Sequence, residues 1–342
     1  MNVDKVLLAS PRGFCAGVEK AIKALDWMTK VFMPPVYCYH EIVHNQYVVD
    51  HFKSLGVVFV DDVAEVPNGA PLMLSAHGSP PSVIASAQAN GGTVIDAVCP
   101  LVTKVHHELK VRSRKGYTVL YVGHEGHEEA VGTMAVAPES VHLIQNEADI
   151  DAVAQMEGPF ALLSQTTLSL DEWQDLRDYA IAQIPDLWLP NRSDLCFATT
   201  NRQAALREIA ATADAVVVIG SANSSNTVAL TKVAITVGCE NVFRVNAATE
   251  LPDDLAGVVG VTAGASAPES LVNEVLERLN AREGVYVNPV TIEDEYFPPP
   301  PELRELLRSL ESLISLSFKG SLPQDDVASR DREFSAATVL AR

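Results

Sequence analysis

The chain has 342 residues, of which 47% are hydrophobic and 20% charged, and this length predicts two or three domains with sizeable cores. A formal net charge of −19 argues against nucleic acid as a partner, because phosphate binding requires clustered Lys and Arg. No apolar run approaches the roughly 18 residues of a membrane span, and the start has too short an apolar stretch for a secretory signal. Five cysteines at wide spacing form no disulfide framework, so we expect a cytoplasmic protein in a reducing compartment.

Buried apolar runs alternate with helical stretches along most of the chain. Runs of about four to eight residues end in Gly, Ser or His and lead into helical patterns, which is typical of parallel α/β units. The loops after the carboxyl ends of such strands are where ligands bind. The expected strands lie within residues 5–10, 57–60, 71–78, 116–126, 160–167, 214–225 and 257–266.

Three cysteines stand at the predicted start of a helix. Cys15 precedes a helical pattern in "PRGFCAGVEKAI", and Cys196 precedes another in "CFATTNRQAALREIA". Cys99 precedes Pro100, a residue favoured at the first helical position. Since the helix dipole and the free amides at that end lower the pKa of a thiol, we expect thiolates that are ready to bind metal.

Polar loops recur in register with these cysteines. The first loop comes 28 or 29 residues after each cysteine and contains, in turn, His44, His127 and Ser225. A second loop comes 62 to 70 residues after each cysteine and contains, in turn, His77, Thr167 and Ser266. The recurrence predicts three similar α/β modules, each of which contributes one thiolate and two polar loops to a common centre. The two other cysteines, Cys38 and Cys239, follow no such pattern and are interpreted as buried small hydrophobic residues.

The modules predict four segments, with boundaries at residues 1–98, 99–195, 196–285 and 286–342. The last segment has an acidic stretch, four consecutive prolines and one amphipathic helix, which we interpret as a strap on the surface, or as a helix that pairs with another chain. The helix carries Leu303, Leu306, Leu307, Leu310 and Leu313. The final 24 residues are polar, and we expect them to be mobile.

Three cysteines that meet at one point suit either a Cys₃ zinc site or an iron–sulfur cluster. Their separations match no zinc knuckle or ribbon. Three protein ligands on a four-iron cubane leave one iron open, and such an iron can act as a Lewis acid and pass electrons. A thiol hydrolase built on one cysteine is less favoured, because it leaves the other two unexplained.

The histidines and serines of the polar loops suit an anion. Histidine can be cationic near neutral pH, and helix amides add further donors, so these groups would form an anion cage in an otherwise acidic protein. In "GHEGHEE", Gly126 and the position after a strand argue against the regular helix that a zinc H-E-x-x-H motif needs. We interpret Glu129 as a proton donor, because a desolvated carboxyl group keeps its proton at higher pH.

At these residues the sequence resembles the 4-hydroxy-3-methylbut-2-enyl diphosphate reductases, the last enzymes of the non-mevalonate isoprenoid pathway. The matching motifs run in order from residue 11 to about residue 270 and are "PRGFCAGVEKAI", "HEIVHNQYVV", "SAHG", "DAVCPLVTKVH", "GHEGHEE", "SQTTLS", "CFATTNRQ", "GSANSSNT" and "GVTAGASAP". The set is far more specific than any single motif. Two departures are the prolines after His77 and Glu128, which stands where proline is common; neither removes a ligand.

The resemblance implies an α/β fold of three similar parallel-sheet modules in a pseudo-threefold arrangement around one central [4Fe–4S] cluster. Cys15, Cys99 and Cys196 would hold the cluster and leave one iron open to the hydroxyl group of the substrate. The implied diphosphate ligands are His44, His77, His127, Ser224, Ser225, Asn226 and Ser266. Glu129 with Thr166 or Thr167 would handle protons.

The implied reaction uses two electrons and two protons to remove the hydroxyl group as water and yields isopentenyl diphosphate or dimethylallyl diphosphate. The implied electron donors are ferredoxin or flavodoxin, reduced by NADPH through a reductase. One alternative is a quinolinate-synthase-like enzyme with three cysteine ligands, which would prefer a dicarboxylate to a diphosphate. Another is a non-catalytic iron–sulfur sensor, which would need no anion cage and would carry a signalling surface or an effector domain.

Overall fold

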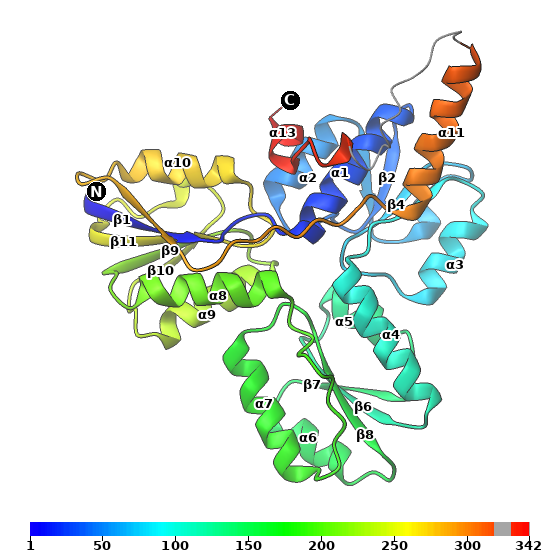
Figure 1. Ribbon diagram of the computed structural model, residues 1–342, viewed down its shortest axis with the longest axis horizontal. Coiled ribbons are helices and arrows are strands. Elements are labelled where there is room, and N and C mark those ends of the chain that lie inside the picture. The colour runs from blue at the N-terminus through cyan, green and yellow to red at the C-terminus, as the bar shows by residue number, and fades with distance from the viewer. Residues whose placement is uncertain (318–329, 342) are drawn as a thin grey trace. The chain divides into compact units, whose positions relative to one another are not determined.

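The computed structural model describes residues 1–317 and 330–341, and the chain forms two compact units (Figure 1). Unit 1 comprises residues 1–15, 44–46 and 101–294, and unit 2 comprises residues 16–43, 47–100 and 295–342. Three parallel sheets, two in unit 1 and one in unit 2, confirm the predicted α/β fold of three parallel-sheet modules. Along the described ranges, no helix is long and apolar enough to cross a membrane.

The largest sheet of unit 1 has five parallel strands in the order β10-β9-β11-β1-β12. Its central strands are rich in Val and Ile and are buried on both faces, as strands of parallel sheets are. The strands are β1 (Asn2–Ser10), β9 (Ala215–Ile219), β10 (Val242–Val245), β11 (Ala256–Ala263) and β12 (Val285–Pro289). The first strand of the chain thus pairs with β11 and β12, although the predicted boundaries place it in the first module.

Helices cover both faces of this sheet (Figure 1). α8 (Phe197–Ala210) and α9 (Ser225–Thr236) pack on one face through Leu206, Leu230 and their neighbours. α10 (Glu269–Leu279) packs on the other face through Leu271, Val272 and Val275, and η2 (Ala248–Glu250) lies beside it. The loops that follow β9 and β11 therefore emerge at the carboxyl edge of a rigid sheet.

The second sheet of unit 1 has three parallel strands in the order β7-β6-β8, which are β6 (Thr118–Val122), β7 (Val141–Ile144) and β8 (Phe160–Ser164). One face buries α4 (Pro100–Arg114) and α5 (Glu128–Met134). The other buries α6 (Glu147–Ala154) and α7 (Leu170–Gln183), with Trp173 in the core. Side chains cap these helices at their amino ends: Asn146 caps α6 in a capping box and Ser169 caps α7.

Unit 2 contains the remaining sheet, with the parallel order β3-β2-β4-β5. Its strands are β2 (Val36–Tyr39), β3 (Val57–Val60), β4 (Leu72–Leu74) and β5 (Val94–Asp96), and its first helices are α1 (Ala16–Val31), α2 (Gln46–Ser54) and α3 (Pro81–Ala89). η1 (Val63–Glu65) and α3 pack on one face of this sheet. A capping box at Asp62 begins η1.

The C-terminal part of unit 2 differs from its prediction. The predicted leucine helix is α11 (Pro301–Ser317), in which Leu303 and Leu307 are buried and Leu313 is exposed. The expectation of a mobile tail is wrong for residues 330–341, which pack on α1 and include α13 (Ala336–Leu340). The rest of that predicted tail, residues 319–329 and 342, lies outside the described residues.

Buried ionic contacts hold this C-terminal segment against α1. Lys23 Nζ lies 2.7 Å from a carboxylate oxygen of Asp331, and both side chains are buried. The same ammonium group donates to the backbone oxygens of Asp331 and Phe334, and the Ala336 amide donates to Glu19. The sequence is polar here, but Asp331 is buried and paired rather than solvated.

Candidate active site

Each of the three predicted cysteines directly precedes a helix. Cys15 lies before α1, Cys99 lies before α4 and Cys196 is the N-cap residue of α8. The Cys196 sulfur accepts the Thr199 amide at 3.2 Å and lies 2.9 Å from the Thr199 hydroxyl oxygen. The predicted placement of the three cysteines at helix starts is therefore confirmed.

Within unit 1, Cys15 and Cys196 form a pair. Burial, followed by the neighbouring Cys15 sulfur, raises the pKa of the Cys196 thiol to about 11. Without a bound metal, loss of hydration outweighs the helix amides at this thiol, and the expectation of a thiolate that is ready to bind metal stays a prediction. A cationic metal centre would stabilise the thiolate form of a sulfur in such surroundings.

A fully buried arginine, which was not predicted from the sequence, joins the segments of this pair. Arg202 on α8 donates through Nε and a terminal nitrogen to the Gly13 oxygen at 2.9 and 2.8 Å, and also to the Phe14 oxygen at 3.1 Å. Glu293 balances its charge at 3.0 Å. The motif "CFATTNRQ" contains this residue, but Gly13 and Phe14, whose oxygens it binds, lie almost 190 positions away.

The backbone before Cys15 requires glycine. Gly13 has φ +66°, and a Cβ atom there would lie 3.1 Å from the Ala267 oxygen. This close approach lets the amides of Gly13 and Cys15 donate to the oxygens of Ala263 and Ala265. The loop after β11 thereby positions Cys15 in unit 1.

Cys99 belongs to unit 2, where its amide donates to the Ala76 oxygen at 3.0 Å. This bond joins the Cys99 turn to the loop that contains His77. Lys20 on α1 is 7% exposed, and its Nζ donates to the Val98 oxygen at 2.8 Å. Burial lowers the pKa of Lys20, whereas Cys99 and two carboxyl groups oppose that change.

The other two cysteines are buried, which agrees with their interpretation as small hydrophobic residues. Cys38 lies within β2 and is fully buried. Cys239 is 6% exposed in the turn after α9, and its thiol lies 3.6 Å from the Asn241 oxygen.

Glu129 is a buried carboxyl group in the first turn of α5. The Thr166 amide donates to one of its oxygens at 2.7 Å, and the Thr166 hydroxyl donates to the other at 2.9 Å. Burial raises the pKa of Glu129 to about 7 even though both bonds from Thr166 lower it, and nearby Asp194 adds to the rise. The side chain can therefore hold or release a proton near neutral pH.

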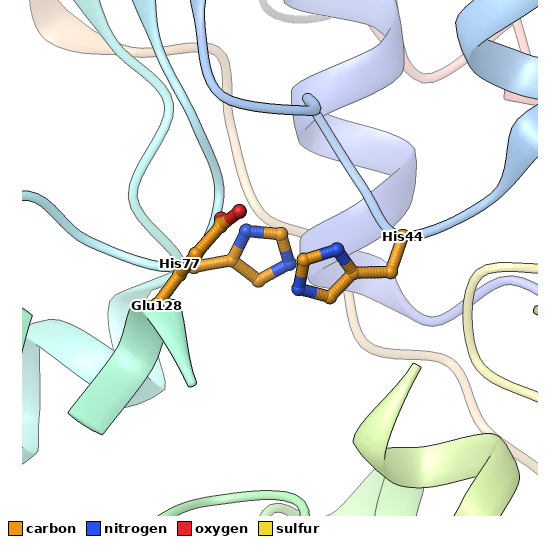
Figure 2. Close-up of side chains that lie close together, drawn as sticks. All are labelled: His44, His77 and Glu128. Atoms are coloured by element: carbon orange, nitrogen blue, oxygen red, sulfur yellow. The ribbon is translucent and has the colours of Figure 1, made fainter. Parts of the chain in front are cut away.

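His127 and His44 lie close together in unit 1. His127 is the N-cap residue of α5, and its Nδ1 accepts the Glu129 amide at 3.1 Å. The His44 and His127 rings have centroids 5.6 Å apart. Figure 2 shows the His44 ring with the carboxylate of Glu128, and a nitrogen of the former lies within 4.8 Å of an oxygen of the latter.

A hydroxyl and amide cluster joins the two sheets of unit 1. The Thr167 hydroxyl donates to Ser225 Oγ at 3.0 Å, and Gln165 Nε2 donates to both hydroxyl oxygens, at 2.9 and 3.0 Å. Gln165, which was not predicted as a site residue, stands between the end of β8 and Thr166 in "LSQTT". The only feature of the sequence that could have indicated Gln165 is its position in that motif.

The remaining polar residues predicted in the third module are held by backbone contacts. Ser224 caps α9, and Asn226 Oδ1 accepts the Ala265 amide at 2.8 Å. The Ser266 hydroxyl donates to the His44 oxygen at 2.9 Å. These bonds connect the loops after β9 and β11 with residues 44–46.

The H-E-x-x-H interpretation is excluded by the local structure. His124 Nε2 lies 3.1 Å from Glu172 Oε1 on α7, whereas α5 begins only at Glu128. Unit 1 therefore gathers Cys15, Cys196, His44, His127, Glu129, Thr166, Thr167, Ser224, Ser225, Asn226 and Ser266, whereas His77 and Cys99 belong to unit 2.

The fold and site define an α/β protein of parallel sheets whose loops present cysteine thiols, imidazoles and a buried carboxyl group, which are groups able to bind metal or move protons. A family model described as LytB protein matches residues 6–280. The chain belongs to the LytB family, whose members are iron–sulfur enzymes.

Several similar proteins bear the name of one enzyme. A 4-hydroxy-3-methylbut-2-enyl diphosphate reductase from Rhodopirellula baltica is 45% identical over 89% of this chain and 97% of its own length. One from Leifsonia xyli is 45% identical over 88% of this chain and 91% of its own length.

Solved structures agree with the sequence relatives. The reductase from Plasmodium falciparum superposes with a TM-score of 0.86 at 29% identity, covering 91% of this chain and all of that one. A second structure, described as the terminal enzyme of the non-mevalonate pathway, has a TM-score of 0.60 at 28% identity and covers 81% of this chain and 99% of that one. The chain is thus an oxidoreductase of isoprenoid biosynthesis, as the sequence predicts, and the quinolinate-synthase-like and sensor alternatives are not favoured.

Proposed function

We propose that this chain binds one [4Fe–4S] cluster through Cys15, Cys99 and Cys196 and reduces 4-hydroxy-3-methylbut-2-enyl diphosphate. The observation that carries the ligand assignment is the closeness of Cys15 to Cys196 at the start of α8, where Arg202 binds the backbone oxygens of Gly13 and Phe14. When bound, a cluster with three protein ligands supplies electrons and one Lewis-acidic iron.

The polar loops would hold the diphosphate group. Ring N–H groups of His44, His77 and His127, together with hydroxyl and amide groups of Ser224, Ser225, Asn226 and Ser266, can donate hydrogen bonds to anionic oxygens. Gln165 keeps Thr167 and Ser225 in a fixed arrangement, which lowers the entropy lost on binding. In a chain with a net charge of −19, such a local set of donors favours an anion that the rest of the surface repels.

Glu129 would supply the proton for the departing hydroxyl group. Its raised pKa leaves a protonated fraction near neutral pH, and Thr166 orients both carboxyl oxygens. Two electrons and two protons convert the substrate into water and either isopentenyl diphosphate or dimethylallyl diphosphate. Thr166 and Thr167 would orient the substrate hydroxyl group and relay the proton from Glu129 to it.

The partners of the reaction are proposed from the family resemblance. Ferredoxin or flavodoxin would deliver electrons, with an NADPH-linked reductase upstream. A location in the cytoplasm stays a prediction, based on the wide spacing of the cysteines.

Replacement of each of the five cysteines by serine tests the ligand assignment. Anaerobic preparations of the Cys15, Cys99 and Cys196 variants should lose most of their iron and sulfide, because each loses one thiolate ligand. The Cys38→Ser and Cys239→Ser variants serve as matched controls and should keep about four irons per chain. Equal iron loss in either control would contradict the assignment.

Replacement of His44 or His77 by leucine tests the diphosphate site. Each variant should bind a diphosphate product more weakly by about 1–3 kcal/mol for one charge-assisted hydrogen bond, with the iron content intact. Calorimetric titration with isopentenyl diphosphate measures this loss. Unchanged affinity in both variants would show that other groups bind the diphosphate.

A further inference from the structure

Lys20 is a buried lysine on α1 that the proposed reaction does not use. The residue is 7% exposed, and its ammonium group donates to the Val98 oxygen at 2.8 Å. A lysine is rarely buried to this extent unless it is paired, so the position requires an explanation.

The bonded oxygen belongs to the turn that presents Cys99. The Val98 amide donates to Asp96 Oδ1 at 2.9 Å, and the Cys99 amide donates to the Ala76 oxygen at 3.0 Å. Lys20 thus closes a turn whose other polar groups are already fixed by β5 and by the loop that contains His77. Loss of its ammonium group would leave the Val98 oxygen without this partner.

The charge of Lys20 faces Cys99 as well as two carboxyl groups. Among the groups that attract the ammonium, Cys99 ranks ahead of Asp96 and Glu302. The two carboxyl groups line a cavity of about 260 Å³ beside β5; Glu302 is exposed there, whereas burial raises the pKa of Asp96. A buried cation acts more strongly on a nearby sulfur than an exposed one, because the local dielectric constant is low.

We propose that Lys20 is a positioning residue for the Cys99 ligand, since it holds the Val98–Cys99 turn and places a fixed positive charge beside the Cys99 thiolate. The inference rests on the proposed ligation of the cluster by Cys99. A reduced cluster carries one more negative charge than an oxidised one, and a neighbouring cation therefore favours the reduced form. Lys20 would both retain the cluster and make it easier to reduce.

Three substitutions in the full chain, reconstituted anaerobically, separate these two effects. Lys20→Met removes both the charge and the donor, Lys20→Gln removes the charge but keeps a donor, and Lys20→Arg keeps both. Lys30→Met is the matched control, because Lys30 lies on the same helix, is 41% exposed and pairs with Asp26 instead.

The readouts are the midpoint potential of the cluster, measured by a potentiometric titration with electron paramagnetic resonance, and the rate of iron loss to a chelator. Lys20→Met and Lys20→Gln should shift the equilibrium roughly tenfold toward the oxidised cluster, about 59 mV for one electron. Lys20→Met should also lose iron roughly tenfold faster. Lys20→Arg and Lys30→Met should stay near the unsubstituted chain in both readouts.

A midpoint potential in Lys20→Met equal to that of the unsubstituted chain would overturn the inference. If that variant retains too little cluster for titration, the Gln and Arg variants decide the outcome, and equal potentials in those two would overturn it. A Cys99→Ser chain measured in parallel tests the ligation by Cys99 separately from the role of Lys20. Full iron content in that chain would overturn the proposed ligation, whereas loss of iron there with an unshifted Lys20→Gln potential would overturn the role of Lys20 alone.

Discussion

Glu129 in unit 1 and Asp331 in unit 2 are carboxyl groups with the same exposed fraction, 2% each, but with opposite surroundings. Asp331 faces the Lys23 ammonium at 2.7 Å and accepts the Tyr296 hydroxyl at 3.0 Å. Glu129 accepts only neutral donors from Thr166 and lies near a second carboxyl group, that of Asp194.

The contrast shows that burial alone does not determine what a carboxyl group can do. A buried carboxylate beside a cation connects two segments, here α1 and the C-terminal segment. A buried carboxyl group without a cation has its proton affinity raised into the physiological range. The first arrangement serves structure, whereas the second suits proton transfer.

Removal of the Asp331 carboxylate should have the largest effect. Asp331→Ala leaves the Lys23 charge buried and unpaired, so the free energy that holds the C-terminal segment on α1 should fall by about 3–5 kcal/mol. Hydrogen exchange of the Ala336 amide, which donates to Glu19, measures this opening.

The exposed pair of Arg278 and Asp253 provides the control for this variant. Asp253 is 94% exposed, and Asp253→Ala should change stability by no more than about 1 kcal/mol. Protection of the Ala336 amide that survives Asp331→Ala unchanged would show that the ion pair does not hold the segment.

Glu129→Gln should have the opposite effect on stability. The pKa of Glu129 is raised from 4.5 to about 7 in the folded chain, so its contribution to stability is fully present below pH 4.5 and is lost as the pH rises through 7. Glutamine does not titrate. As the pH rises from 4 to 8, the unfolding free energy of the metal-free variant should therefore increase by about 3 kcal/mol relative to that of the unsubstituted chain.

Urea unfolding at several pH values measures this gain. The exposed neighbour Glu125 is the control, and Glu125→Gln should leave the pH dependence unchanged. An unfolding free energy that falls between pH 4 and pH 8 as steeply in Glu129→Gln as in the unsubstituted chain would assign the titration to another group.

The same Glu129→Gln variant should lose turnover by roughly 10²-fold, within the usual span of general acid catalysis. Glutamine keeps the size and hydrogen-bonding capacity of the side chain but cannot release a proton, so cluster content and substrate binding should persist. Anaerobic turnover with an artificial electron donor in excess measures the loss. Near-normal turnover would mean that the proton comes from the diphosphate of the substrate or from Thr166 or Thr167.

Thr166→Val should have the smallest effect. The variant removes the hydroxyl bond to Glu129, which favours the ionised form, and keeps the backbone bond. The pKa of Glu129 should rise, and the alkaline limb of the pH–turnover profile should move upward by about one pH unit. Thr167→Val should not move that limb, because Thr167 contacts Ser225 instead. If the alkaline limb does not move in Thr166→Val, the group that titrates there is not the one that accepts the Thr166 hydroxyl.

Much of the candidate site could be predicted because its signals are local. Pro100 after Cys99 and the helical pattern after Cys196 are properties of neighbouring residues, and the helix starts lie where these signals place them. Arg202 and Lys20 escaped prediction because each acts on a backbone oxygen of a segment far away in the sequence. A long basic side chain in a helical pattern gives no sign of such a partner.

The sequence by itself determined the alternation of strands and helices, the cysteines that begin helices and the motifs of the family. Only the tertiary structure decided that β1 joins β11 and β12, that residues 330–341 pack on α1, and that the pKa of Cys196 is raised. The reason is physical: helix starts depend on adjacent residues, whereas strand pairing and desolvation depend on which distant segments exclude water from a given group.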